Sequence, residues 1–230
     1  MKKIILTLAA ATLLHACNFN MNGITVGNGK KVTCKGPVTV KTFDLNGFDS
    51  IVINGSSDME LTQGDTFKVL VKANEDVFQY LDYKVSDGTL LLETIDNVNI
   101  RAEEFDISIT LPTLKSVKVN GAADIDLKYG YKSAEPLIVE VNGAGDFEFN
   151  NIAVPSLKFE FNGAGDIEAE QLDVKELNVI INGAGDIDLS GKAVKASFSV
   201  NGAGSIDARR LDCQDFSTSK SGLASIKLSK

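Results

Sequence analysis

The chain has 230 residues, which allows one or two domains. Its 23 basic and 31 acidic residues give a net charge of -8, and this balance excludes the basic surface that binds nucleic acid. Hydrophobic residues make up 43% of the sequence, but Trp is absent and only 7% of residues are aromatic, so we expect a narrow core filled by aliphatic side chains.

The first 16 residues have the pattern of a signal peptide. Lys2 and Lys3 supply a positive start, and the apolar stretch 4–14 follows. This stretch has 11 residues, whereas an α-helix needs about 20 to cross a bilayer. We therefore expect residues 1–16 to be an export signal that is removed.

The end of this segment resembles the lipobox of bacterial lipoproteins, in which a cysteine is acylated and becomes the first residue of the mature chain. Here the sequence is Leu14-His15-Ala16-Cys17, so Cys17 is the predicted lipidation site. The alternative is ordinary signal cleavage after Ala16, which requires a small residue where Leu14 stands. Several acyl chains on one residue anchor a protein stably to a membrane.

Removal of residues 1–16 takes away two lysines and no acid, and leaves 21 basic and 31 acidic residues with a net charge of -10. Residues 17–35 are predicted to be the lipidated cysteine and a flexible tether rich in Gly and Asn, and residues 36–230 the folded body. The expected location is the cell envelope, at the outer membrane, with the periplasmic or surface face left open.

Cys34 and Cys213 remain in the mature body. An exported protein could join them by a disulfide. They lie near opposite ends of the body, and distant coils of a repeat protein do not touch. We therefore expect two unpaired thiols, with the bridged form as the alternative.

A repeat with a period of about 20 residues dominates the rest of the chain. Each copy begins with an Asn-Gly corner, continues through two small residues to a polar, usually acidic, residue, and ends in alternating apolar residues; the last copy is degenerate, with Ser-Gly at the corner followed by Leu223. The last six copies are separated by 22, 20, 20, 19 and 20 residues. The copies begin at Asn54, Asn120, Asn142, Asn162, Asn182, Asn201 and Ser221.

The first glycine of the corner is present in every copy, which indicates a tight corner with a positive φ angle. The second glycine position also accepts Ser57 and Ala123, so it is predicted to need a small residue rather than a positive φ. The seven predicted corner glycines are Gly55, Gly121, Gly143, Gly163, Gly183, Gly202 and Gly222.

Alternation of apolar and polar residues on both sides of the corner predicts two strands in each copy. A β-hairpin is the alternative, because Asn-Gly is also its strongest signal. The corner spans four or five residues and recurs once per period, which favours stacked coils. Since parallel crossovers are right-handed in about 98% of cases, the expected fold is all-β, a right-handed parallel β-helix (solenoid) with coils of about 20 residues.

The segment 65–112 departs from this rhythm. Strands are expected at 67–71, at 90–92 and at 105–111, with one or two helical turns at 75–81 and a turn at 86–88. The first gap of 66 residues, from Asn54 to Asn120, leaves room for about three irregular coils. We therefore expect an elaborated set of coils within the same body.

Together, the opening Phe43-Asp-Leu-Asn-Gly-Phe-Asp-Ser-Ile-Val-Ile-Asn-Gly55 and the serial Asn-Gly-Ala-Gly-Asp corners resemble the head GIN domain family of "putative autotransporter adhesins". The resemblance covers about residues 38–230. It implies a β-helical fold and an envelope location, in proteins of Bacteroidetes-like bacteria that are exported and lipid-anchored. It implies no catalytic residues, and its adhesin label is a presumption.

No enzyme active site is expected. The one histidine, His15, leaves with the signal peptide, and neither Cys34 nor Cys213 has an evident base partner. Tyr129 and Tyr131, on either side of Gly130, are the best candidates for an exposed aromatic platform, although a plain loop explains them as well.

The acidic residues of the corners form two columns on one outward face of the strand. The first consists of Asp124, Asp146, Asp166 and Asp186, and the second of Asp126, Glu148, Glu168, Asp188 and Asp207. The first column has a structural explanation, in which each Asp caps backbone N–H groups of the corner. Capping does not explain why the second is almost wholly acidic. Either the second column is simply solvated, or the face binds divalent cations or polycationic partners weakly, in the millimolar range, with Asp124, Asp146, Asp166 and Asp186 as candidate metal ligands.

The sequence therefore predicts a lipid-anchored envelope protein that presents a β-helical binding or adhesion surface. It is not expected to be an enzyme or to hold a cofactor, and its partners are the membrane and an envelope or extracellular polymer or protein. One alternative is a polysaccharide-processing enzyme on the same scaffold. The other is a structural or sensory envelope component with no ligand of its own.

Overall fold

The computed structural model describes residues 30–95 and 98–229, and these form an all-β protein. One short 3-10 helix, η1 (Glu75–Tyr80), lies in the segment where helical turns were expected. The strands are β1 (Lys31–Thr33), β2 (Val38–Phe43), β3 (Ser50–Gln63), β4 (Lys68–Asn74), β5 (Leu81–Ser86), β6 (Thr89–Thr94), β7 (Asn99–Arg101), β8 (Phe105–Leu111), β9 (Ser116–Lys128), β10 (Tyr131–Lys132), β11 (Leu137–Ala144), β12 (Phe147–Phe149), β13 (Ile152–Ala164), β14 (Ile167–Asp212), β15 (Asp215–Gly222) and β16 (Ser225–Leu228).

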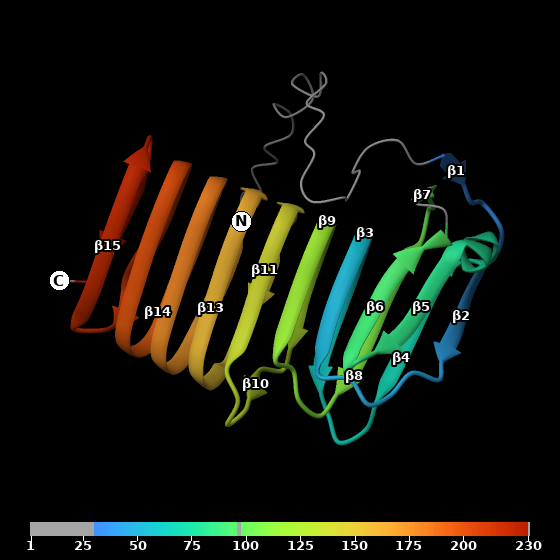
Figure 1. Ribbon diagram of the computed structural model, residues 1–230, viewed down its shortest axis with the longest axis horizontal. Helices are drawn as coiled ribbons and strands as arrows, with labels where there is room; N and C mark the ends of the chain where they lie inside the picture. Colours follow the sequence, from blue (N-terminus) through green and yellow to red (C-terminus); the bar gives the residue numbers. More distant parts are fainter. Residues whose placement is uncertain (1–29, 96–97, 230) are drawn as a thin grey trace, which may run out of the picture.

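Fourteen of these strands form one mixed sheet, and β1 and β7 form a separate parallel pair. The large sheet follows the order β10-β13-β14-β12-β9-β3-β8-β4-β2, with β11, β15, β16, β5 and β6 attached to it. Figure 1 shows β3, β9, β11, β13, β14 and β15 as a row of similar elements side by side. No helix among residues 30–95 and 98–229 has the length and hydropathy to span a membrane.

The repeated segments pair with one another in parallel and in the register that the corner motif predicts. Asn142 is opposite Asn120 on one side and Asn162 on the other, and Asn162 is opposite Asn182. Every pair between these segments is parallel, which excludes the hairpin alternative. Successive turns of the chain therefore lie 20 or 22 residues apart along the sequence, and the sheet runs through the corners themselves.

The prediction for the first gap is wrong. Asn54 is opposite Asn120, and the two strands β3 and β9 stay in register from Ser50 to Thr62. No irregular coil separates them, so the segment 65–112 lies on the other side of β3. The physical reason is that the two similar corners at Asn54 and Asn120 stack directly on one another. The chain between them therefore pairs with the opposite edge of β3.

That displaced segment is only partly parallel. Strands β6 and β8 pair with β3 in parallel, as expected for a further coil. Strands β2, β4 and β5 pair antiparallel with β4, β8 and β6 respectively. The chain thus folds back on itself at this end, and the sheet as a whole is mixed rather than wholly parallel.

The first corner glycine has a positive φ in all seven copies, from 89° at Gly222 to 159° at Gly163. A second constraint was not evident in the sequence. A Cβ atom at Gly183 would lie 1.9 Å from the carbonyl oxygen of Gly163, the glycine beneath it. Gly55 begins the column, and a Cβ there would meet nothing within 4 Å. Only glycine therefore allows the backbones of stacked corners to approach this closely.

The second glycine position does not behave as predicted. Gly145 and Gly165 also have positive φ angles, of 148° and 142°. A Cβ at Gly185 would lie 2.0 Å from the oxygen of Gly165, although Ala123 is accommodated at the equivalent position. The conformation of this corner differs between copies, so a small side chain tolerated in one coil is not tolerated in the next.

The core is built from the alternating apolar positions of the strands. Most of its members are aliphatic, as expected, but four phenylalanines gather in the middle. The rings of Phe147 and Phe161 meet edge to face with centroids 5.6 Å apart, and those of Phe149 and Phe159 are also 5.6 Å apart. Larger rings therefore fill two adjacent coils, where neighbouring coils use Ile, Leu and Val.

Candidate functional site

Three of the residues predicted to have special roles are cysteines. Cys17, the predicted lipidation site, lies outside the described residues, so lipidation stays a prediction. Cys34 and Cys213 are both buried and unpaired, as expected. Burial raises the pKa of the Cys34 thiol, and the charge of Asp76 raises it further, which makes this thiol a poor nucleophile.

The predicted aromatic platform is half wrong. Tyr129 is 91% exposed, but Tyr131 is only 1% exposed. The Tyr131 hydroxyl donates to the carbonyl oxygen of Leu114 at 2.9 Å and accepts from its backbone N–H at 2.8 Å. Tyr131 is therefore a core residue that ties β10 to the segment between β8 and β9, and Tyr129 is the exposed tyrosine that remains.

The two predicted columns of acidic residues lie on one outward face. Their members alternate with buried residues such as Ile125 and Ile167 along each strand, and the register brings them side by side. The structure adds Asp58, Glu60 and Asp106, because β3 and β8 continue the same face. We define the acidic face as Asp58, Glu60, Asp106, Asp124, Asp126, Asp146, Glu148, Asp166, Glu168, Asp186, Asp188 and Asp207.

The first column is held by a ladder of hydrogen bonds between coils. The backbone N–H of Asp146 donates to Oδ1 of Asp124 at 2.9 Å, and that of Asp166 donates to Oδ1 of Asp146 at 3.1 Å. Asp186 repeats the contact with Asp166 at 2.8 Å, and the hydroxyl of Ser205 closes the series on Asp186 at 2.7 Å. Each carboxylate thus caps the next coil, which is a structural role close to the one predicted.

Basic side chains neutralise the two ends of the acidic face. Lys128 pairs with Asp126 and lies 3.7 Å from Glu60, and Lys72 lies 3.9 Å from Asp106. At the other end, Arg209 pairs with Asp207 at 2.5 Å. Among the described residues, no ion pair is formed by the six acids between these ends, which are Asp146, Glu148, Asp166, Glu168, Asp186 and Asp188.

The first part of the face is hollowed. A groove of about 630 Å³ is lined by Asp58, Asp106 and Asp124 together with Glu60, Asp126, Asp146, Glu148 and Lys72. Burial raises the pKa of Asp58 and of Asp106; the charge of Asp124 adds to the first, and a hydrogen bond to Glu104 adds to the second. The groove therefore concentrates negative charge that solvent only partly screens.

A dedicated metal site does not result from this arrangement. Within the described ranges, no group of three or more His, Cys, Asp or Glu side chains is placed to hold a metal ion. The four candidate ligands Asp124, Asp146, Asp166 and Asp186 are engaged with backbone N–H and hydroxyl groups instead.

Weak calcium binding to this face stays a prediction. Titration with ~10 mM calcium is expected to give measurable heat and a raised melting temperature, as mass-action linkage requires for millimolar binding. Calorimetry and thermal melting measure the two effects. The absence of both would leave only the capping role for these aspartates.

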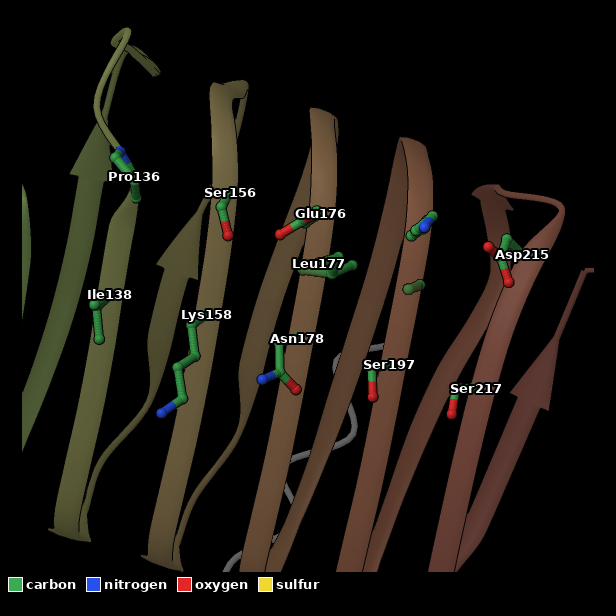
Figure 2. Close-up of a pocket in the computed structure, with 12 residues that line it drawn as sticks. Pro136, Ile138, Ser156, Lys158, Glu176, Leu177, Asn178, Ser197, Asp215 and Ser217 are labelled. Atoms are coloured by element: carbon green, nitrogen blue, oxygen red, sulfur yellow. The ribbon is translucent and has the colours of Figure 1, made fainter.

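A second, smaller hollow of about 440 Å³ lies over β11, β13, β14 and β15. Figure 2 shows polar side chains rising from successive strands, with Lys158, Asn178, Ser197 and Ser217 in neighbouring coils. Both signs of charge are present, since Glu176 and Asp215 accompany Lys158 and Lys195. This surface is mixed in character and does not favour one class of ligand.

Sequence interpretation missed one ordered feature of the corners. Each corner asparagine donates from Nδ2 to Oδ1 of the asparagine in the preceding coil, and the series starts with Asn54, whose Nδ2 donates to Glu93 at 2.5 Å. The signal was available, because Asn recurs in six of the seven copies. The distances for Asn120, Asn142, Asn162, Asn182 and Asn201 are 2.8, 3.2, 3.0, 2.8 and 3.1 Å.

The fold and these recurring corners define a class of all-β domains built on one large sheet. Residues 47–230 match the family model described as "Putative auto-transporter adhesin, head GIN domain". The chain belongs to this family, and the predicted resemblance is confirmed, with a match that begins at Gly47 rather than near Val38.

Solved structures share the fold. A "putative adhesin" from Bacteroides fragilis superposes with a TM-score of 0.69 and 20% identity, over 85% of this chain and 99% of that one. A "putative lipid binding protein" from Parabacteroides distasonis gives 0.67 and 20%, over 87% and 97%. A "putative adhesin" from Parabacteroides merdae gives 0.54 and 16%, over 88% and 100%. No curated protein matches this sequence.

The pKa shifts of the acidic face predict an unusual dependence of stability on pH. The raised pKa values of Asp58 and Asp106 mean that their ionised forms destabilise the fold above the ordinary Asp pKa of about 4. The melting temperature is therefore expected to rise as the pH falls from 7 toward 4. Below that it should fall, because Arg209 lowers the pKa of Asp207 to about 2 and this stabilisation is lost on protonation.

Thermal melts between pH 7 and pH 3 measure this profile. The double variant Asp58→Asn with Asp106→Asn should lose the rise above pH 4 and keep the fall below it. A wild-type melting temperature that decreases steadily from pH 7 to pH 4 would contradict the assignment.

Proposed function

We propose that this chain is a lipid-anchored protein of the bacterial cell envelope, with a body that is a right-handed parallel β-helix and presents a binding surface without catalysis. The observation that carries the proposal is the middle of the acidic face, where six carboxylates on adjacent coils form no ion pair among the described residues; the charges of Arg209 and Arg210 reach only Asp188 and Glu168, at one end of the row. Cys17 is the anchor, and the outer membrane is the expected site of attachment.

The handedness rests on two arguments. The register between coils steps by 20 or 22 residues through parallel pairs, which is the spacing of a solenoid. Parallel crossovers in one sheet are right-handed in about 98% of cases. In this arrangement the antiparallel strands β2, β4 and β5 cover one end of the stacked coils.

The chemistry of the acidic face favours a cationic partner. Neighbouring coils are separated by about 4.8 Å, so adjacent carboxylates repel, by roughly 1 kcal/mol per pair in water. A polymer or protein segment with regularly spaced ammonium or guanidinium groups relieves this repulsion along the whole row. The description of the family as adhesins, and the names of two of the structural neighbours, support a role in attachment.

Pull-down of envelope components by the purified body tests this function. The variant Asp146→Asn, Asp166→Asn, Asp186→Asn removes three charges but keeps an Oδ1 acceptor for each capping contact. The control variant Asp173→Asn, Glu176→Gln, Asp215→Asn removes the same charge from exposed positions elsewhere. Wild type and the control should recover the same basic partner, and the acidic-face variant should lose it. Equal recovery by all three would contradict the proposal.

Hydrolysis of polysaccharides is not expected. The mature chain has neither His nor Trp, and no coil carries a residue cluster unlike the others. Incubation with envelope and dietary polysaccharides should therefore yield no reducing ends above background. Saturable product formation that a single carboxylate substitution abolishes would favour the enzyme instead.

A further inference from the structure

The hydrogen-bonded series of corner asparagines, from Asn54 to Asn201, is called the asparagine ladder below. Its asparagines stand in a sequence that favours deamidation, but their side chains are held by hydrogen bonds. All six of its asparagines are followed by glycine, and the Asn-Gly step is the one most prone to deamidation, because glycine leaves its own amide nitrogen unobstructed. In the ladder, however, each inner asparagine donates from Nδ2 to the asparagine of the preceding coil and accepts at Oδ1 from the asparagine of the following coil.

The two ends of the ladder differ. At the first end, Asn54 donates to the Glu93 carboxylate and accepts from Asn120, so both sides of its amide are bonded. At the last end, Asn201 donates to Asn182 at 3.1 Å, but the residue opposite it in the following coil is Ser221. Within the described part of the chain, no hydrogen bond to the Asn201 side-chain oxygen is present, and Asn201 is exposed.

We propose that the ladder protects the corner asparagines from deamidation and that Asn201 is the corner at which this modification begins. The backbone nitrogen of Gly202 attacks Cγ of Asn201 and forms a new C–N bond. The Cγ–Nδ2 bond breaks, and ammonia leaves with the proton of the glycine amide. Water then opens the succinimide ring at either carbonyl group and gives aspartate or isoaspartate.

The modification propagates. Aspartate or isoaspartate at position 201 no longer has the amide hydrogen that Asn182 accepted, so Asn182 becomes the new open end of the ladder. Asn182 is the other exposed member, whereas Asn54, Asn120, Asn142 and Asn162 are half-buried. The corners are therefore modified in order, from the C-terminal coil inward, and each step adds one negative charge near the acidic face.

Peptide mass spectrometry of the folded protein, aged at mildly alkaline pH, tests this order. Asn46 precedes Gly47 in an exposed loop where nothing crowds the glycine, so it serves as an unprotected internal reference. Asn201 should react next. Asn120, Asn142 and Asn162 should react at least tenfold more slowly than Asn201, because a tenfold change in rate corresponds to roughly the net stabilisation that one hydrogen bond provides. In urea all of these sites should react at similar rates. Equal rates at Asn201 and Asn142 in the folded protein would overturn the proposal.

Three variants separate the effect of the ladder from simple fraying of the last coil. Ser221→Asn supplies the missing donor and places it before Gly222, so the rate at Asn201 should fall roughly tenfold and position 221 should become the fast site. Ser221→Ala should leave Asn201 unchanged. Asn201→Asp should raise the rate at Asn182 by a similar factor. If Asn201 deamidates equally fast in the wild type, in Ser221→Asn and in Ser221→Ala, the cause is fraying of the last coil, and the protective role of the ladder is contradicted.

Discussion

Gly183→Ala is expected to destabilise the protein by about 3 kcal/mol, because it combines backbone strain at positive φ with a steric overlap. The φ angle of Gly183 is 156°, and its Cβ atom would lie 1.9 Å from the carbonyl oxygen of Gly163. That oxygen belongs to the backbone of the adjacent coil, so relief requires two coils to move apart. Urea denaturation monitored by circular dichroism measures the loss.

Gly55→Ala is the matched control. Gly55 occupies the same corner position with a φ of 138°, but it begins the column and a Cβ there meets no atom within 4 Å. Its cost should be the strain alone, about 1 kcal/mol. The comparison isolates the stacking of the glycine column, and equal unfolding midpoints for the two variants would contradict it.

Cys17→Ser is expected to release the protein from the membrane fraction entirely. A serine at this position cannot be acylated, so the expected lipid anchor is lost. The anchored wild type should resist a carbonate wash, because two or more acyl chains bind a bilayer stably. Fractionation of cells, with a blot for the protein in each fraction, measures the difference.

Cys34→Ser is the control for this experiment, because it removes a buried thiol of the body and keeps Cys17. It should remain with the membranes. If the Cys17→Ser protein also remains there after the wash, the anchor assignment is wrong.

Most of the fold could be predicted from the corner motif. Because an Asn-Gly pair recurs at a nearly constant interval, the strands, their parallel register and the positive φ of the corner glycines were predictable from pattern alone. The outward direction of Asp124 and Asp146 followed from the alternation of the strand in the same way. These features depend on local sequence and on the stacking of like on like.

Features that depend on distant contacts were not predictable. Nothing in the sequence between Asp65 and Pro112 shows that this segment lies outside β3 rather than between β3 and β9, because the order of stacking is decided by which corners fit. Asp106 joins the acidic face only through the pairing of β8 with β3. The burial of Tyr131 in β10 depends on the hydrogen bonds of its hydroxyl to the backbone of Leu114, which lies between β8 and β9.

The most direct test of the cationic-partner proposal is a calorimetric titration of the body with polylysine at low salt and at ~1 M salt, where the Debye length falls to about 3 Å. Saturable binding is expected at low salt and should be lost at high salt. Binding should be weakened strongly by Asp146→Asn, Asp166→Asn, Asp186→Asn and little by Asp173→Asn, Glu176→Gln, Asp215→Asn. Binding that is equally weak in both variants would show that only net charge matters, and it would contradict a binding surface on the acidic face.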